Sequence, residues 1–207
     1  MVVYTAVFGG YDTVRPPVDP GEARWVCVTD GPDAPEPWHT VRLPEWQAGE
    51  AQRRARLYKT RSHRWFLDNI VVWIDGNIRL RVAPEELLKY IERADIAAIE
   101  HDREHHYSEA AECILAGKGD RERIVAQTKA YLGEECPPLT VWATGLVVRR
   151  QTPAVVRLNE LWWQQIERYS VRDQIGLPYC LWKLGMPCSP IPGPFTGTDE
   201  FDYFEHG

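Results

Sequence analysis

Short apolar runs, each stopped by a turn or by charged residues, alternate along this chain with longer segments that favour helix. The clearest runs are Val2 to Phe8, Arg24 to Val28, Ile70 to Ile74, Ile96 to Ile99 and Gly145 to Arg149. Each has the length and the β-branched composition of one buried strand. Such alternation predicts an α/β layered fold, with a mostly parallel central sheet and helices on both faces.

Six helix-favouring segments lie between or after these runs. They are Glu50 to Trp65, Pro84 to Arg93, Tyr107 to Leu115, Asp120 to Tyr131, Leu158 to Tyr169 and Arg172 to Leu184. A further extended piece is expected at Thr40 to Leu43. Pro178 should kink or shorten the last helix, because proline has no amide proton. No linker or repeat divides the chain.

The length of 207 residues fits one domain. Proline and glycine recur after Gly185, so we expect a domain over residues 1–185 and an irregular tail over residues 186–207 that packs on the same domain. The longest apolar runs are far shorter than the ~20 residues of a membrane span. Five scattered cysteines without a C-x-x-C pair argue against a disulfide framework, so a reducing, cytoplasmic setting is expected.

The charge balance argues against nucleic acid as a partner. The chain has 24 Lys and Arg against 30 Asp and Glu, a net charge of -6. Nucleic-acid binding depends on cations that neutralise phosphates. A chain with more acids than bases could bind nucleic acid only through a local basic patch. We therefore expect no nucleic-acid partner.

The segment Trp73 to Asn77 ends the most strand-like run of the chain in Asp-Gly-Asn. Ligands of open α/β sheets bind beyond the carboxyl ends of the strands. Asp75 and Asn77 would place two oxygen donors on one turn, where a divalent ion could bind with water and phosphate as further ligands. The same three residues also suit a plain turn in which Asp75 bonds to its own backbone.

A run of six cations without an acid, from Arg53 to Arg64, lies in the first predicted helix. Within it, Arg56, Lys59 and His63 have the spacing of one helical face. Arginine binds phosphate through two hydrogen bonds and lysine as a point charge. The face could bind a diphosphate, although a solvent-exposed charged surface is the commoner use of such a run.

Three of the six histidines fall within six residues, at His101, His105 and His106. On a helix, His101, His105 and Glu109 would share a face and could bind zinc. This pattern leaves a metal-dependent hydrolase open as an alternative function. Nine tryptophans leave a second alternative, a non-catalytic carbohydrate-binding module with exposed aromatic platforms.

Arg172, Asp173 and Gln174 begin the last predicted helix. Ser170 and Asp173 have the spacing of a capping box, in which Asp173 would bond to the backbone. The alternative is that Asp173 points its carboxylate into a site at the strand ends.

Taken in order, these motifs resemble the glycosyltransferase-like family of the plant mucilage-related and turgor-regulation-defect proteins. The resemblance rests on residues 4–12, 27–30 and 73–77, on Arg56 with Lys59 and His63, on His101 with Arg103 and Glu109, and on residues 145–150 and 172–174. It implies a GT-A-like fold that binds a nucleotide-diphosphate sugar. The predicted function is transfer of a sugar from that donor to a glycan or to another acceptor hydroxyl.

The resemblance also implies roles for particular residues. Asp75 occupies the place of the metal-binding aspartate, with Asn77 and His206 as further candidate ligands for Mn²⁺ or Mg²⁺. Asp173 is expected near the reacting sugar and His101 in the same pocket, as the catalytic pair. The donor is expected to contact the following residues: Tyr4, Phe8, Gly9, Gly10, Asp12, Asp30, Arg56, Lys59, His63, Asp75, Asn77 and Gln174.

Overall fold

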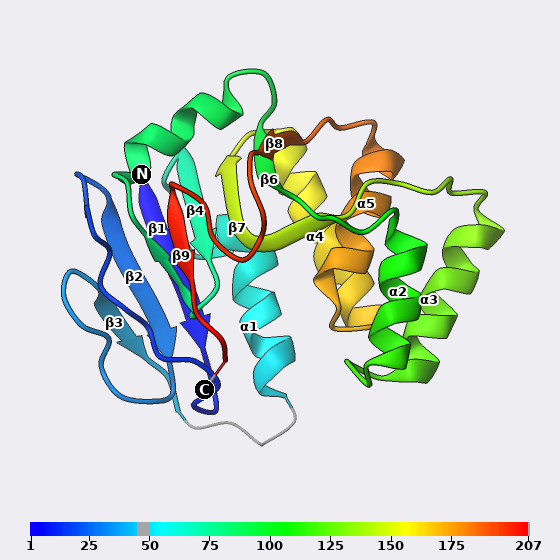
Figure 1. The fold of residues 1–207 in the computed structure, drawn as a ribbon, viewed down its shortest axis with the longest axis horizontal. Helices are drawn as coiled ribbons and strands as arrows, with labels where there is room; N and C mark the ends of the chain where they lie inside the picture. Colours follow the sequence, from blue (N-terminus) through cyan, green and yellow to red (C-terminus); the bar gives the residue numbers. More distant parts are fainter. Residues whose placement is uncertain (45–49, 207) are drawn as a thin grey trace.

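A computed structural model describes residues 1–44 and 50–206 of the chain. Its centre is a seven-stranded sheet in the order β3-β2-β1-β4-β7-β6-β8 (Figure 1). The strands are β1 (Val2–Val7), β2 (Arg24–Thr29), β3 (His39–Arg42), β4 (Ile70–Ile74), β6 (Ile96–Glu100), β7 (Trp142–Arg150) and β8 (Ser189–Ile191). Six run in one direction, and β7 is antiparallel to both of its neighbours. The predicted mostly parallel α/β sheet is confirmed.

The two faces of the sheet are covered differently. One face carries α1 (Ala51–Thr60), α2 (His106–Leu115), α3 (Arg121–Gly133), α4 (Pro153–Arg168) and α5 (Asp173–Leu184). The other face is covered by the 3-10 helix η2 (Pro84–Ile91) and by a ribbon of β5 (Ile78–Leu80) and β9 (Phe201–Tyr203). A second short 3-10 helix, η1 (Ser62–Arg64), follows α1. Figure 1 shows α2 and α3 together at one end of the molecule.

Alternate residues of the central strands enter opposite cores, as a buried sheet requires. Tyr4 and Trp73 pack on the face of the α-helices, and Val3 and Val72 pack on the face of η2. This double burial explains why the runs are apolar throughout and not alternately polar. Within residues 1–44 and 50–206, no helix is long and apolar enough to cross a membrane.

The predicted strands and helices are present, with three differences in the C-terminal third of the chain. First, the predicted irregular tail contains β8, which joins the sheet edge beside β6, and β9, which pairs with β5. Ile191 and Phe201 are buried there. The division into residues 1–185 and 186–207 stays a prediction.

The other two differences concern α5. The helix continues past Pro178 to Leu184, so Pro178 does not shorten it; the alternative, a kink, stays a prediction. The hydrogen bond that Pro178 cannot donate is outweighed by the burial of the residues that follow it. The capping box is also wrong, because the residue before the helix, Arg172, has no side-chain cap and the Asp173 carboxylate points elsewhere.

A large bulge interrupts β7 at the edge of the sheet where β4 and β6 end. Ala98 pairs with Val147, but the next residue, Ile99, pairs with Ala143. Three residues of β7, 144–146, are therefore without a partner on β6. On the other side they stay close to β4, since Leu146 pairs with Ile74 and the Asp75 amide donates to the Gly145 carbonyl. Bulges of this kind re-aim side chains, here that of Thr144.

Candidate active site

The carboxyl ends of β1, β2, β4 and β6 meet at one edge of the sheet because these strands are parallel. Gly9, Asp30, Asp75 and His101 follow them in that order. The antiparallel β7 brings its amino end, with Thr144, to the same edge. The candidate active site is built on these loops.

Lys59 lies at the centre of a cluster of ion pairs beside this edge. Its Nζ lies 2.6 Å from Asp173 Oδ2 and 3.2 Å from Asp75 Oδ1, and it donates to Thr144 Oγ1 at 3.0 Å. Arg56 adds a second cation, with Nε 3.2 Å from Asp173 Oδ1 and Nη1 4.0 Å from Asp75 Oδ1. Four segments of the chain, α1, the end of β4, β7 and the start of α5, thus meet at two cations and two carboxylates.

The cluster has an inner and an outer part. The side chains of Lys59 and Asp173 are 1% and 2% exposed, whereas those of Arg56 and Asp75 are 21% and 26% exposed. Burial alone would raise the pKa of Asp173, but Arg56, Lys59 and the Thr144 hydroxyl hold that pKa well below its usual range. Asp173 is therefore ionised, and the outer pair is the part that a ligand can reach.

The backbone of α1 is held in place at its C-terminal end by a buried arginine. Arg149 of β7 is fully buried and donates to the Lys59 carbonyl at 2.7 Å, to the Thr60 carbonyl and to Asn159 Oδ1. The Tyr4 hydroxyl donates to the same Lys59 carbonyl at 2.9 Å. A cation at the C-terminal end of a helix also complements the helix dipole. These contacts fix the helix that carries Arg56 and Lys59.

Glycine is required at position 76 of the turn after β4. A Cβ atom there would lie 2.5 Å from Val7 Cγ2 and 2.9 Å from Asp12 Cβ. The close approach brings the loop after β1 against the turn that carries Asp75. Burial raises the pKa of Asp12; the bond from His206 opposes this shift, and the charge of Asp75 adds to it.

The C-terminal segment that follows β9 runs to the same edge. Figure 1 shows it beside the tip of β1. His206 Nδ1 lies 2.7 Å from Asp12 Oδ1, and its ring packs on Tyr11. The Asn77 side chain is buried and donates from its amide nitrogen to the Phe204 carbonyl at 2.8 Å. Asn77 thus ties the C-terminal segment down, which is a use of this residue that the Asp-Gly-Asn pattern alone does not suggest.

No preformed metal centre is present among the described residues, since no group of three or more His, Cys, Asp or Glu side chains there is arranged to hold an ion. Asp75, Asp12 and His206 are neighbours, but His206 bonds to Asp12. A divalent ion would therefore need ligands from a bound substrate to complete its coordination.

The histidine cluster is divided among structural tasks. His105 precedes α2, and its ring accepts from the Ser108 amide as an N-terminal cap. His106 is buried, and its Nδ1 accepts from the Leu139 amide. Burial lowers the pKa of His106 to about 4, so the ring is neutral.

Glu109 pairs with Arg103 and Arg172. The zinc face predicted for a helix over His101, His105 and Glu109 is wrong, because α2 begins only at His106.

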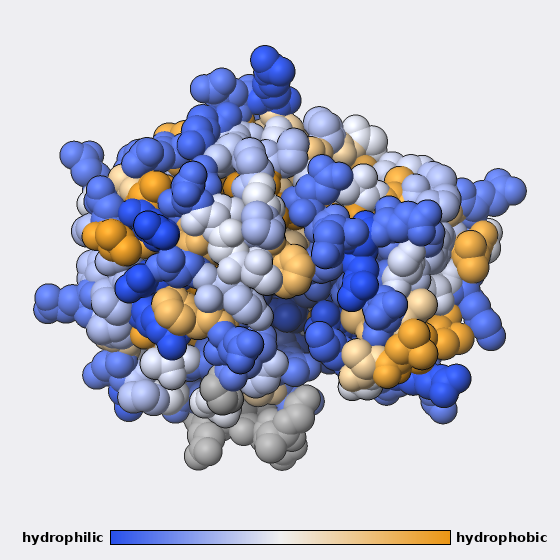
Figure 2. All heavy atoms as spheres, viewed as in Figure 1, coloured by the Kyte–Doolittle hydropathy of each residue, from blue (hydrophilic) through white to orange (hydrophobic). Residues whose placement is uncertain are grey.

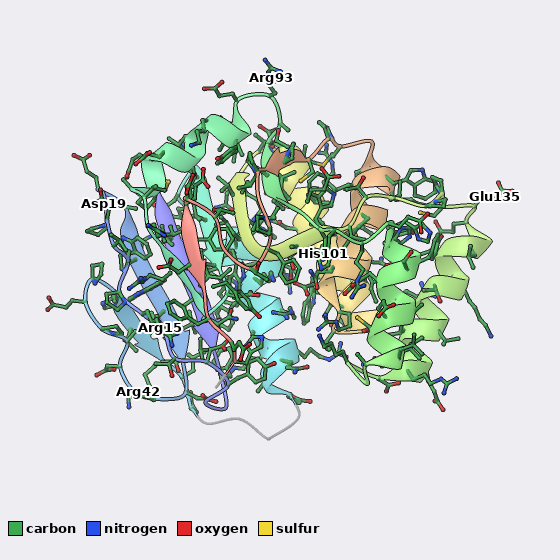
Figure 3. All side chains as sticks on the ribbon, viewed as in Figure 1. Arg15, Asp19, Arg42, Arg93, His101 and Glu135 are labelled. Carbon is green, nitrogen blue, oxygen red and sulfur yellow. The ribbon has the colours of Figure 1, made fainter. Side chains whose placement is uncertain are left out.

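His101 is the histidine of this cluster that lies at the strand edge. Its Nδ1 lies 2.6 Å from Asp102 Oδ1, and its ring stacks on Phe195 with 4.7 Å between ring centroids. Figure 2 shows a hydrophilic hollow near the middle of this face, and Figure 3 labels His101 in the central part of the same view.

Three residues expected at the donor lie elsewhere. Tyr4 and Phe8 are buried in the core, so the structure contradicts direct contact with a donor. Tyr4 in β1 and Phe8, directly after it, both pack on the face of the α-helices, where Tyr4 supports α1. His63 does not share a face with Arg56 and Lys59, because α1 ends at Thr60; its Nε2 lies 2.8 Å from Glu160 Oε1.

The other expected donor contacts lie at or near the edge. Gly9 and Gly10 are exposed, both with positive φ, and the Gly9 amide donates to Asp30 Oδ1 at 3.0 Å. Gln174 is the second residue of α5 and accepts a bond from Arg172. Sequence reasoning missed Thr144 and Arg149. Gly145 was the available local signal, since a glycine within a strand often marks a bulge, whereas nothing local signals a buried clamp such as Arg149.

The tryptophans do not form an exposed binding platform in the described residues. Trp25, Trp38, Trp73 and Trp162 are buried, and Trp142, Trp163 and Trp182 are partly buried against the core. Trp65 is exposed and packs on Tyr58. Trp46 lies outside the described residues.

The fold and site define a layered α/β domain with cations and carboxylates at the edge of the sheet where ligands of such folds bind. The domain model described as "TOD1/MUCI70, glycosyltransferase-like domain" matches residues 36–191. The chain therefore belongs to this glycosyltransferase-like family.

The chain is also similar to a curated relative, and its fold resembles that of solved glycosyltransferase structures. The probable hexosyltransferase MUCI70 of Arabidopsis thaliana is 24% identical over 208 residues, which cover 84% of this chain and 36% of the relative. The chain thus spans about a third of the relative's length. The WbbM bifunctional glycosyltransferase has a similar fold, with a TM-score of 0.51, 13% identity, and coverage of 93% of this chain and 38% of that one. Mouse xyloside xylosyltransferase 1 aligns with a TM-score of 0.49 and 9% identity, over 92% of this chain and 84% of that one.

Proposed function

We propose that this domain transfers a sugar, a hexose by analogy with the relative, from a nucleoside-diphosphate donor to an acceptor hydroxyl. The observation that carries the proposal is the partly exposed pair of Arg56 and Asp75 backed by buried Lys59 at the end of β4. The acceptor oxygen bonds to the anomeric carbon of the sugar, the bond from that carbon to the diphosphate breaks, and the hydroxyl proton leaves to a base. Stabilising the charge of the leaving diphosphate is then the main electrostatic task.

Arg56 would contact the diphosphate directly. Lys59 is too deeply buried for that contact, so we assign it the task of orienting Asp75 and of adding positive potential behind Arg56. Asp173 was expected beside the reacting sugar. Its burial and its bonds to Lys59 and Thr144 favour a positioning role within the cluster. The exposed loop with Gly9, Gly10 and Asp30 is our candidate for the nucleoside contacts.

His101 is our candidate for the base that receives the hydroxyl proton. Asp102 Oδ1 and the Arg103 amide both lie against Nδ1, at 2.6 Å and 3.1 Å. In the tautomer that donates from Nδ1 to Asp102, Nε2 carries the lone pair that would accept the hydroxyl proton. A hydrolase built on three histidines has no support from the geometry, since His105 and His106 have structural partners.

Metal dependence remains a proposal in which Asp75 and His206 are the protein ligands. A bound diphosphate would supply the missing oxygens, as phosphates commonly do for Mg²⁺ and Mn²⁺. Asn77 is not retained as a ligand, because its side chain is buried and bonded to the C-terminal segment. When bound, the ion would add positive charge at the leaving group.

A thermal-shift screen of nucleoside diphosphates and their sugars, with and without Mn²⁺, tests the function. A ligand at ~100 times its dissociation constant adds roughly 2.7 kcal/mol, which is several degrees for a domain of this size. The shift should be lost in Asp75→Ala and kept in Asp33→Ala, an exposed aspartate paired with Arg42. No shift with any nucleotide, or an equal shift in both variants, would contradict the proposal. A shift that is independent of Mn²⁺ would contradict the metal site alone.

A further inference from the structure

A cavity lies at the carboxyl end of β6, on the same edge of the sheet as the cluster of Lys59, Arg56, Asp75 and Asp173. It has a volume of about 590 Å³ and is lined by residues 100–102 on one side and by residues 190–196 on the other. We infer that this cavity is the acceptor subsite and that it binds a neutral sugar of the acceptor. The inference rests on the proposed transferase function and adds the class of the second substrate.

Position is the first argument. Neighbouring strands are about 4.8 Å apart, and β7 lies between β4 and β6, so the ends of these two strands are roughly 10 Å apart. Within the sheet β7 fills this interval, so a sugar ring would bridge Asp75 and His101 beyond the strand ends, over the amino end of β7. A donor diphosphate at Asp75 would thus present its sugar toward His101, and a hydroxyl held in the cavity would meet it there.

The wall made by residues 190–196 is mostly apolar and rich in proline. Pro190, Pro192 and Pro194 fix three backbone φ angles in this stretch. β8 anchors its start to β6, and Ile191 is buried. Phe195 stacks on His101 with an angle of 17° between the rings. Apolar faces of this kind suit the C–H face of a sugar ring, and a prearranged wall costs less entropy on binding.

The opposite wall is acidic. Glu100 and Asp102 are exposed carboxylates at the mouth of the cavity, and the nearby Arg103 pairs with Glu109 and Glu112. Carboxylates accept hydrogen bonds from sugar hydroxyls but repel phosphate and uronate groups. The cavity is therefore unsuited to the donor diphosphate and suited to an uncharged acceptor.

The test uses the nucleotide sugar that the full chain turns over, with 4-nitrophenyl glycosides of neutral sugars and of glucuronic acid as acceptor probes. In Phe195→Ala, KM for the neutral acceptor should rise about tenfold, whereas KM for the donor should stay within about twofold. Phe195→Tyr, which keeps the aromatic ring, should have the acceptor KM of the wild-type protein. Trp65→Ala, an exposed aromatic outside the cavity, should change neither constant.

The acidic wall has its own variant, Glu100→Lys, at an exposed position where misfolding is not expected. It should raise kcat/KM for the glucuronide relative to the neutral glycoside by about tenfold. An unchanged acceptor KM in Phe195→Ala, or an unchanged preference in Glu100→Lys, overturns the inference. So does donor hydrolysis without transfer to any neutral probe, and that outcome leaves the transferase proposal intact. If no nucleotide sugar is turned over at all, both proposals fall.

Discussion

The two halves of the basic segment from Arg53 to Arg64 have opposite environments. In the first half, Arg56 and Lys59 face two carboxylates, Asp75 and Asp173, that lie far away in the sequence. In the second half, Arg61, His63 and Arg64 gather around one oxygen of a single carboxylate, Glu160 of α4.

Depth separates these two clusters more than charge does. Lys59 and Asp173 are sealed in the core, whereas Arg64 is more than half exposed and Glu160 is partly exposed. Buried ion pairs are costly to break because the remaining charge loses its only compensation, but exposed pairs contribute little. The first cluster therefore shapes a site, and the second ties the end of α1 to α4.

Lys59→Met should have the largest effect. Removing the cation leaves Asp173 and Asp75 together with only Arg56 to compensate them, which should lower the free energy of unfolding by about 3–5 kcal/mol. Transfer or donor hydrolysis should fall at least about a hundredfold, since Asp75 loses the nearer of its two cations and the site loses positive potential behind Arg56. Urea unfolding and turnover of the folded fraction measure the two effects. A loss of stability without a loss of turnover would separate Lys59 from the chemistry.

Asp173→Asn should cost about 2–3 kcal/mol, because Lys59 keeps a single carboxylate partner. Burial already lowers the pKa of Lys59, and the loss of Asp173 should lower it further. Lys59 of the folded variant then loses its proton at a lower pH than Lys59 of the unfolded chain. The loss in free energy of unfolding relative to the wild type should therefore shrink as pH rises toward 10. Unfolding curves at pH 7 and pH 9.5 measure the change.

Asp75→Asn, at the more exposed side of the cluster, should lower the free energy of unfolding by less than about 1 kcal/mol.

Glu160→Gln should cost about 1 kcal/mol or less at pH 7. Burial raises the pKa of Glu160, but bonds from His63, Arg64 and Arg61 outweigh it and lower that pKa to about 2. Its stabilising contribution is complete above about pH 4.5 and is lost as pH falls toward 2. The variant and the wild-type protein should therefore differ in urea unfolding at pH 7 and converge at pH 2.5. If Glu160→Gln lowered the free energy of unfolding as much as Asp173→Asn does, the contrast between the two clusters would be wrong.

Arg64→Ala should have the smallest effect, within about 0.5 kcal/mol, because the side chain is exposed and Arg61 and His63 stay on Glu160. Nucleotide affinity should not change. Weaker nucleotide binding in this variant would show that the second cluster also serves the donor.

The parts of the fold that could be predicted from the sequence are those with a local signature. Apolar runs predicted β1, β2, β4, β6 and most of β7, because buried strands need continuous apolar residues. The short strands β5, β8 and β9 were not predicted, since three residues carry no periodic pattern and their partners are distant in sequence. Pro190 lies within β8 at the sheet edge, where proline is tolerated.

For the site, the sequence by itself determined that Asp75 ends a buried strand, that a cationic helix precedes it and that His101 follows another strand. These features are local, so pattern and spacing were enough to place them at strand ends. Only the tertiary structure decided which cations meet which acids. The bulge of β7, the clamp of Arg149 on α1 and the turn of Asp173 toward Lys59 all depend on contacts between segments tens of residues apart. Burial, which separates the inner pair of Lys59 and Asp173 from the partly exposed outer pair of Arg56 and Asp75, is likewise a property of the packed molecule.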